Sequence, residues 1–179
     1  MNFPILSTII FLPLLGAIFL FISRNTNIKN LIYVSLFTSI ANFLLSLFLW
    51  YSFDKSYNGF QFIEESDWIS GFIKFKLGVD GISILFIVLT SFIIPICIIS
   101  CINSIKIRIK EFLIAILILE TLMLGVFCSL DLVIFYLFFE AGLIPMFLII
   151  GVWGGPKRVY SAFKFFLYTL LGSVLMLVA

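Results

Sequence analysis

Long apolar runs separated by short polar connectors make up almost the whole chain. Five runs reach the ~20 residues that a helix needs to cross a hydrocarbon core, and a sixth nearly does. Backbone polar groups in lipid must find hydrogen-bond partners within their own segment, so each run is expected to be a helix. The six predicted transmembrane helices cover residues 3–22, 30–52, 79–103, 111–128, 131–151 and 161–179.

The segment 53–78 is the only long connector, and part of it alternates between apolar and polar residues. The alternation is clearest from Ile73 to Leu77 and briefer from Phe60 to Phe62, with Ser70 and Gly71 between them. A period of two residues is typical of a half-buried strand, so the pattern predicts a β-hairpin on the outer surface. An irregular loop with aromatic side chains at the membrane interface is the alternative.

The distribution of basic residues predicts the orientation of the helices. Connectors one, three and five hold seven of the eleven basic residues: Arg24, Lys29, Lys106, Arg108, Lys110, Lys157 and Arg158. In the 53–78 connector, the charges of Lys55, Lys74 and Lys76 are offset by acidic residues. Because short cytoplasmic loops carry an excess of lysine and arginine, these three connectors are expected to face the cytoplasm or matrix. The N-terminus is then outside.

Composition excludes a water-soluble globule. Of the 179 residues 63% are hydrophobic and 11% are charged, against about 45–50% and about 25% in ordinary soluble domains. The chain has no histidine and three cysteines, Cys97, Cys101 and Cys128. This set excludes His-ligated haem and a four-thiolate iron–sulfur cluster. We interpret the cysteines as small core residues and expect any redox chemistry to take place in another subunit.

Three acidic residues lie near the tight turn between the fourth and fifth runs. Asp131 falls in the first turn of the fifth helix, near Ser129, where it is expected to complement the helix dipole. Glu120 and Glu140 each lie ten residues from the turn centred near residue 130, or about 15 Å, which is half of a ~30 Å hydrocarbon core. Both carboxyl groups are therefore expected near the bilayer midplane. The sequence leaves open whether they face each other.

A carboxyl group in the bilayer centre costs about 2.5–3.5 kcal/mol on insertion scales and is a functional candidate for that reason. A clamp between helices is the structural alternative, but two acids at one depth favour proton exchange. Pro145 is expected to kink the fifth helix, and Gly142 to allow close helix packing. Lys164 either extends towards the inner interface or faces the bundle interior.

Three motifs give the chain a family resemblance: LGVDGIS (Leu77–Ser83), FCSLDLVIFYLFFEAGLIPMFLIIGVWGG (Phe127–Gly155) and RVYSAFKFFLYTLLGSVLML (Arg158–Leu177). In order and spacing they resemble the antiporter-like membrane subunit of respiratory complex I, known as bacterial chain M or mitochondrial subunit 4. The resemblance implies an all-α polytopic membrane protein built on two inverted five-helix repeats. It also implies an outer hairpin in the 53–78 connector.

The resemblance places the chain as one membrane domain, 1–179, in the N-terminal part of such a subunit. Residues 1–110 would hold three leading helices with the outer loop, and residues 111–179 the first three helices of the first repeat. The apolar end of the sequence favours a truncated chain. The family's proton-path glutamate falls on Glu140 and its helix-four carboxylate on Glu120, while its lysines on later helices have no counterpart here.

The function implied is proton translocation coupled to NADH:quinone oxidoreductase activity, with other membrane subunits and lipids as partners and no nucleic acid. This chain would hold no cofactor; NADH, FMN, iron–sulfur clusters and quinone are expected in partner subunits. The membrane would be the bacterial inner membrane or the mitochondrial inner membrane. Two alternatives remain open, namely a subunit of a multi-subunit cation/proton antiporter and a structural or assembly scaffold.

Overall fold

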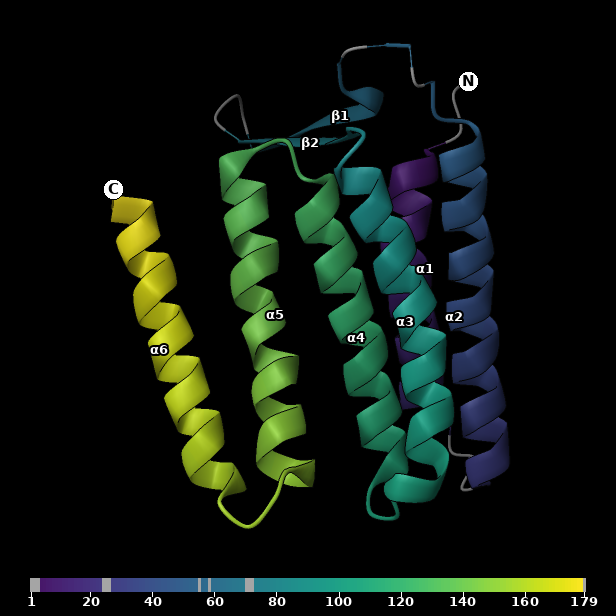
Figure 1. Cartoon of the computed structure of the whole chain (residues 1–179), viewed down its shortest axis with the longest axis vertical. Helices are drawn as coiled ribbons and strands as arrows, with labels where there is room; N and C mark the ends of the chain where they lie inside the picture. Colours follow the sequence, from purple (N-terminus) through teal and green to yellow (C-terminus); the bar gives the residue numbers. More distant parts are fainter. Residues whose placement is uncertain (1–3, 24–26, 55, 58, 70–72, 179) are drawn as a thin grey trace.

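A computed structural model describes residues 4–23, 27–54, 56–57, 59–69 and 73–178. In this part of the chain six long helices stand side by side, with a two-stranded antiparallel sheet across one end of the bundle (Figure 1). The elements, in chain order, are α1 (Ile5–Ile22), α2 (Ile28–Tyr51), β1 (Gln61–Ile69), β2 (Ile73–Val79), α3 (Ser83–Ser104), α4 (Ile109–Cys128), α5 (Leu132–Trp153) and α6 (Arg158–Val178).

The prediction of six helices is confirmed, and most ends differ by one to three residues. All six described helices are long and apolar enough to cross a membrane. The start of the third helix was predicted wrongly: Val79 belongs to β2, and α3 begins at Ser83. Asp80 causes the difference, because its carboxylate accepts a 2.7 Å hydrogen bond from the Ser83 amide. This cap ends the strand and starts the helix.

The hairpin is also confirmed, with longer strands than the alternation indicated. Ile69 pairs with Ile73, and the ladder runs to Gln61 opposite Val79, with two irregularities in register. Leu77 and Val79 are fully buried beneath the sheet. The predicted turn residues Ser70 and Gly71, and also Arg24 and Lys55, lie outside the described residues.

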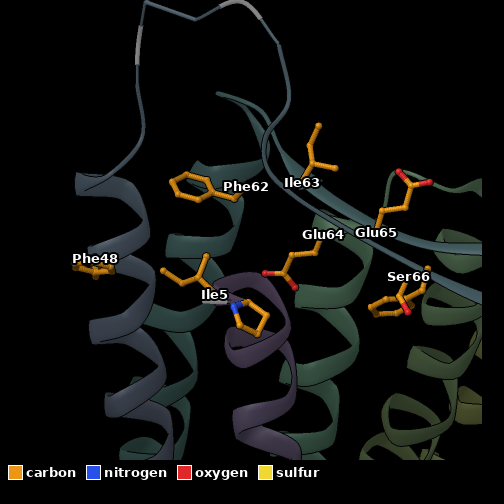
Figure 2. Close-up of a pocket in the computed structure, with 9 residues that line it drawn as sticks. Ile5, Phe48, Phe62, Ile63, Glu64, Glu65 and Ser66 are labelled. Atoms are coloured by element: carbon orange, nitrogen blue, oxygen red, sulfur yellow. The ribbon is translucent and has the colours of Figure 1, made fainter. Parts of the chain in front are cut away.

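Two further contacts tie the hairpin to the helices. The Glu64 carboxylate accepts hydrogen bonds from the backbone amides of Leu6 at 2.8 Å and Ser7 at 3.0 Å, in the first turn of α1. Figure 2 shows the Glu64 side chain directed at this helix end. On β2 the carbonyl of Lys76 accepts a 3.0 Å hydrogen bond from the Leu130 amide in the α4–α5 turn. The sheet therefore joins the N-terminus of α1 to this turn.

Helix α4 lies centrally in the bundle. It packs against α1, α2, α3 and α5, while α6 packs against α5 at the edge (Figure 1). The buried apolar residues form two clusters. One cluster lies near the sheet and includes Leu6, Leu77 and Leu124. The other lies towards the opposite end of the helices and includes Leu20, Leu113 and Leu117.

The connectors α1–α2, α3–α4 and α5–α6 lie at the end of the bundle opposite the sheet (Figure 1). They are the connectors in which the sequence places most of the basic residues. Lys110 donates hydrogen bonds to the carbonyls of Phe21 (3.2 Å) and Ser23 (2.7 Å), so a predicted inner-side lysine caps the C-terminus of α1. The Trp153 indole donates to the carbonyl of Ile107 at 2.8 Å. At this end of the bundle, side chains of α4 and α5 thus bond to backbone carbonyls of neighbouring segments.

Close packing of α4 on α5 occurs at Gly125 rather than at Gly142. A Cβ atom on Gly125 would lie 2.5 Å from the Phe138 ring, whereas nothing lies within 4 Å of a Cβ on Gly142. The expectation for Gly142 is therefore wrong within this chain. The residue instead lines an apolar hollow of about 520 Å³. Helix α5 continues through Pro145 to Trp153, so the proline does not interrupt the helix.

Candidate functional site

Glu120 lies inside the bundle and is fully buried. Its Oε1 atom accepts a 2.8 Å hydrogen bond from the side-chain amide of Asn42 on α2, which is also fully buried. On α4 the nearest core leucines, Leu117 and Leu124, belong to different apolar clusters. The pair therefore occupies a polar layer between the two apolar cores.

Asn42 belongs to a buried polar face of α2 that the sequence analysis missed. Ser35, Ser39, Asn42 and Ser46 recur at helical spacing, and all four are fully buried. Ser46 is hydrogen-bonded to the buried Ser91 of α3, with 2.7 Å between the hydroxyl oxygens. Polar residues three and four positions apart within an apolar run were a signal for an inward-facing polar stripe.

Glu140 lies on α5 and is half-buried. Its carboxylate lies within hydrogen-bond reach of the Ser173 hydroxyl on α6, whose single proton can go either to the carboxylate or to the carbonyl of Leu170, 2.9 Å from the hydroxyl oxygen. Tyr136, one turn earlier on α5, interacts with both Glu140 and Ser173. The carboxyl group is therefore surrounded by hydroxyl groups at the α5–α6 contact.

The structure resolves the question that the sequence left open about the two glutamates. Each is the same number of residues from the helix end nearest the α4–α5 turn, as predicted. However, Glu120 bonds to α2 and Glu140 to α6, and no hydrogen bond joins them in the described part of the chain. They are two separate carboxyl sites on adjoining helices.

Other predicted residues have ordinary structural surroundings. Asp131 directly precedes α5 and accepts hydrogen bonds from the amides of Val133 (2.8 Å) and Ile134 (3.2 Å), so it is a helix cap at the end where its charge was expected to complement the helix dipole. Lys164 is exposed, with its ammonium group 6.0 Å from the centre of the Tyr160 ring. Because Tyr160 lies closer to the start of α6, the lysine extends towards the interface rather than into the bundle.

The interpretation of the cysteines as small core residues is confirmed for two of the three. Cys101 and Cys128 are buried, but Cys97 is exposed on the surface of α3 and is not a core residue. Among the described residues, no group of three His, Cys, Asp or Glu side chains is arranged to hold a metal ion.

A hollow lies near the hairpin. It measures about 840 Å³ and lies between the sheet, α1 and α2 (Figure 2). Glu64 contributes to its lining, but the carboxylate is already engaged by the first turn of α1. The Glu64 carboxylate in this hollow is therefore a helix-capping group rather than a third acidic site comparable to Glu120 and Glu140.

Six helices long and apolar enough to span a membrane, with acidic side chains hydrogen-bonded between helices, define a multi-pass membrane protein. The family model described as NADH:quinone oxidoreductase/Mrp antiporter, TM, matches residues 129–179. This match covers α5, α6 and the Glu140 site.

Curated relatives match nearly the whole chain. NADH-quinone oxidoreductase subunit M of Rhodobacter capsulatus is 56% identical over 98% of this chain and 35% of its own length. Subunit M of Rickettsia prowazekii is 47% identical over 100% of this chain and 37% of its length. NADH-ubiquinone oxidoreductase chain 4 of Arabidopsis thaliana is 50% identical over 97% of this chain and 36% of its length.

These matches confirm the resemblance to the antiporter-like membrane subunit of complex I, subunit M or chain 4. The chain spans about a third of the length of the curated relatives it matches. The division of the chain at residue 110 into leading helices and a first repeat stays a prediction.

Proposed function

We propose that this chain is part of a proton-translocating membrane subunit of NADH:quinone oxidoreductase. Quinone reduction elsewhere in the complex would drive proton transfer through carboxyl groups within the membrane. Glu140 is the proton carrier and Glu120 an auxiliary carboxyl group. The observation that carries the proposal is the Glu140 carboxylate on an apolar helix, bonded to the Ser173 hydroxyl. Among the described residues, no lysine or arginine forms an ion pair with it.

The Ser173 hydroxyl suits a group that gains and loses a proton. A hydroxyl group is both donor and acceptor, and it can rotate. When Glu140 is ionised, Ser173 donates to the carboxylate. When Glu140 is protonated, its O–H can donate to the Ser173 oxygen, while the Ser173 proton bonds to the Leu170 carbonyl. Both protonation states therefore have a partner without movement of a helix.

The names of the relatives support the proposed setting in a complex with NADH:quinone oxidoreductase activity. The chain would be a subunit of a redox-driven translocase, hold no redox centre of its own, and contact other membrane subunits and lipids. NADH, FMN, iron–sulfur clusters and quinone would bind to partner subunits. The membrane would be the bacterial inner membrane or the mitochondrial inner membrane.

The test is the Glu140→Gln substitution in the assembled complex. Glutamine keeps the size and polarity of the side chain but cannot carry a proton, so we expect NADH-driven proton uptake into vesicles to be lost while the complex still assembles. The matched control is Glu111→Gln, which changes an exposed acid of α4 paired with Arg108 at 3.7 Å. Normal pumping in a correctly assembled Glu140→Gln complex would overturn the assigned role.

The family description also includes Mrp antiporters, so a cation/proton antiporter is the second candidate. Its signature would be sodium-dependent transport and purification without redox subunits. A scaffold role predicts a third outcome, in which substitution of either glutamate reduces assembly and leaves pumping per assembled complex unchanged.

A further inference from the structure

The buried pair of Asn42 and Glu120 has two polar atoms without a partner. Asn42 Nδ2 donates to Glu120 Oε1 at 2.8 Å. The other oxygen of each group, Glu120 Oε2 and Asn42 Oδ1, is buried and accepts no hydrogen bond. Each group thus makes one bond to the other and leaves its second atom unsatisfied, which is rare for buried polar groups.

Both unsatisfied atoms are acceptors if Glu120 is ionised. The negative charge would then be buried beside the carbonyl dipole of Asn42, and burial of an uncompensated charge is costly. No described lysine or arginine forms an ion pair with Glu120. The ionised form therefore has one hydrogen bond and no counter-charge.

Nearby hydroxyl groups do not supply the missing donor. Thr121 donates to the carbonyl of Leu117 at 3.2 Å. On α2, Ser39 donates to the carbonyl of Leu36, and Ser46 bonds to Ser91 and to a backbone carbonyl. These bonds use the polar hydrogens of the layer around the pair. The missing hydrogen must come from the pair itself or from water.

One proton on Glu120 Oε2 satisfies both atoms together. A protonated carboxylic acid has an O–H donor and a carbonyl acceptor, and a primary amide has an N–H donor and a carbonyl acceptor. The two groups are complementary in a ring of two hydrogen bonds, of which Nδ2–H···Oε1 is already present. The second bond would be Oε2–H···Oδ1.

We infer that Asn42 is a positioning residue that holds Glu120 as a neutral carboxylic acid through this two-bond ring. The ring itself does not depend on the proposed function. The inference rests on the proposed function for one step, the exchange of the Glu120 proton during transport. Release of the proton requires that the ring open and that water reach the carboxylate. Asn42 thereby controls how readily the auxiliary carboxyl group ionises.

Infrared difference spectroscopy on the assembled complex tests the ring directly. The C=O stretching band of a protonated, hydrogen-bonded carboxylic acid should be present in the wild type and absent from Glu120→Gln. In Asn42→Leu the same band should shift to higher frequency, because the carbonyl oxygen loses its hydrogen bond. Ser39→Ala is the matched control, since it removes a buried polar group of the same α2 face, and it should leave the band in place.

Two outcomes overturn the inference: no acid band lost in Glu120→Gln, or a band at the wild-type position in Asn42→Leu. If Asn42→Leu does not assemble, Asn42→Ala removes both the N–H donor and the carbonyl acceptor and adds no second carboxyl group. It must also shift the Glu120 band. Proton pumping is measured separately. Normal pumping in Glu120→Gln would contradict the auxiliary role of Glu120, while the band would still report whether the ring exists.

Discussion

The carboxylate of Glu64, within a surface strand, accepts a 2.8 Å hydrogen bond from the backbone amide of Leu6 in the first turn of a membrane helix. With its second oxygen bonded to the Ser7 amide, Glu64 satisfies two of the free N–H groups at the start of α1. An acidic side chain from a strand distant in sequence thus caps the N-terminus of α1, a role that usually belongs to a residue next to the helix.

Glu64→Ala should destabilise the N-terminal end of α1. Loss of a helix cap costs about 1 kcal/mol, and the favourable interaction with the helix dipole is lost with it. Thermal unfolding of the purified protein should show a lower midpoint. Glu65→Gln is the neighbouring control, because the Glu65–Lys76 pair is 3.8 Å apart and both side chains are 41% exposed. Equal effects of the two substitutions would contradict the capping role.

Gly125→Ala should weaken the packing of α4 on α5. The added Cβ would lie 2.5 Å from the Phe138 ring, and overpacking of this kind typically costs about 1–3 kcal/mol. A second substitution, Phe138→Leu, should restore part of the stability by removing the clash. Gly142→Ala is the matched control and should be neutral or slightly stabilising, because nothing lies within 4 Å of its Cβ position.

Ser173→Ala should slow proton pumping and leave assembly intact. The change removes the hydroxyl group that bonds to Glu140, and a hydrogen bond to a charged group is worth about 1.5–3 kcal/mol. A pumping rate lower by roughly tenfold is expected, since about 1.4 kcal/mol corresponds to a factor of ten. Ser161→Ala, at an exposed position on the same helix, should pump normally. A rate equal to that of Ser161→Ala would exclude Ser173 from the site.

Asp80 should make the hairpin–α3 junction sensitive to acid. Hydrogen bonds from Ser83 hold the pKa of the Asp80 carboxyl group below its ordinary value of 3.8. Because the folded-state pKa is the lower one, the stabilisation is complete above that ordinary value and is lost as pH falls through the lowered pKa. Asp80→Asn keeps a capping oxygen but does not titrate there.

The measurement for Asp80 is the unfolding midpoint as a function of pH on both sides of 3.8. The wild type should lose its advantage over Asp80→Asn as the pH falls. An advantage that stays constant across this range would contradict the assignment.

The helices and the strand pairing could be predicted because lipid allows few alternatives and because period two is visible in Ile73–Leu77. The start of α3 could not, because apolar Val79 continues the run and only the cap at Asp80 ends the strand. Hydropathy measures how apolar a segment is, and it contains no information about which residue supplies a cap.

The candidate site was predicted in part. The depth of Glu120 and Glu140 follows from counting along two helices joined by a tight turn. Their partners do not, because Asn42 lies 78 positions away in sequence from Glu120 and Ser173 lies 33 away from Glu140. The rotation of each helix about its axis decides these contacts, and that rotation is set by packing such as Gly125 on Phe138.

The hairpin has a consequence for the order in which the protein is made. Glu64 is synthesised 57 residues after Ser7, whose amide it bonds, so α1 enters the membrane before its cap exists. The carbonyl of Lys76 is in turn available before Leu130, its partner in the α4–α5 turn, has left the ribosome. Both strands are thus synthesised after the first helix and before the fourth and fifth helices, whose turn they contact. A ribosome stalled before residue 130 would hold a chain in which the sheet end of the bundle still lacks its partner from the α4–α5 turn.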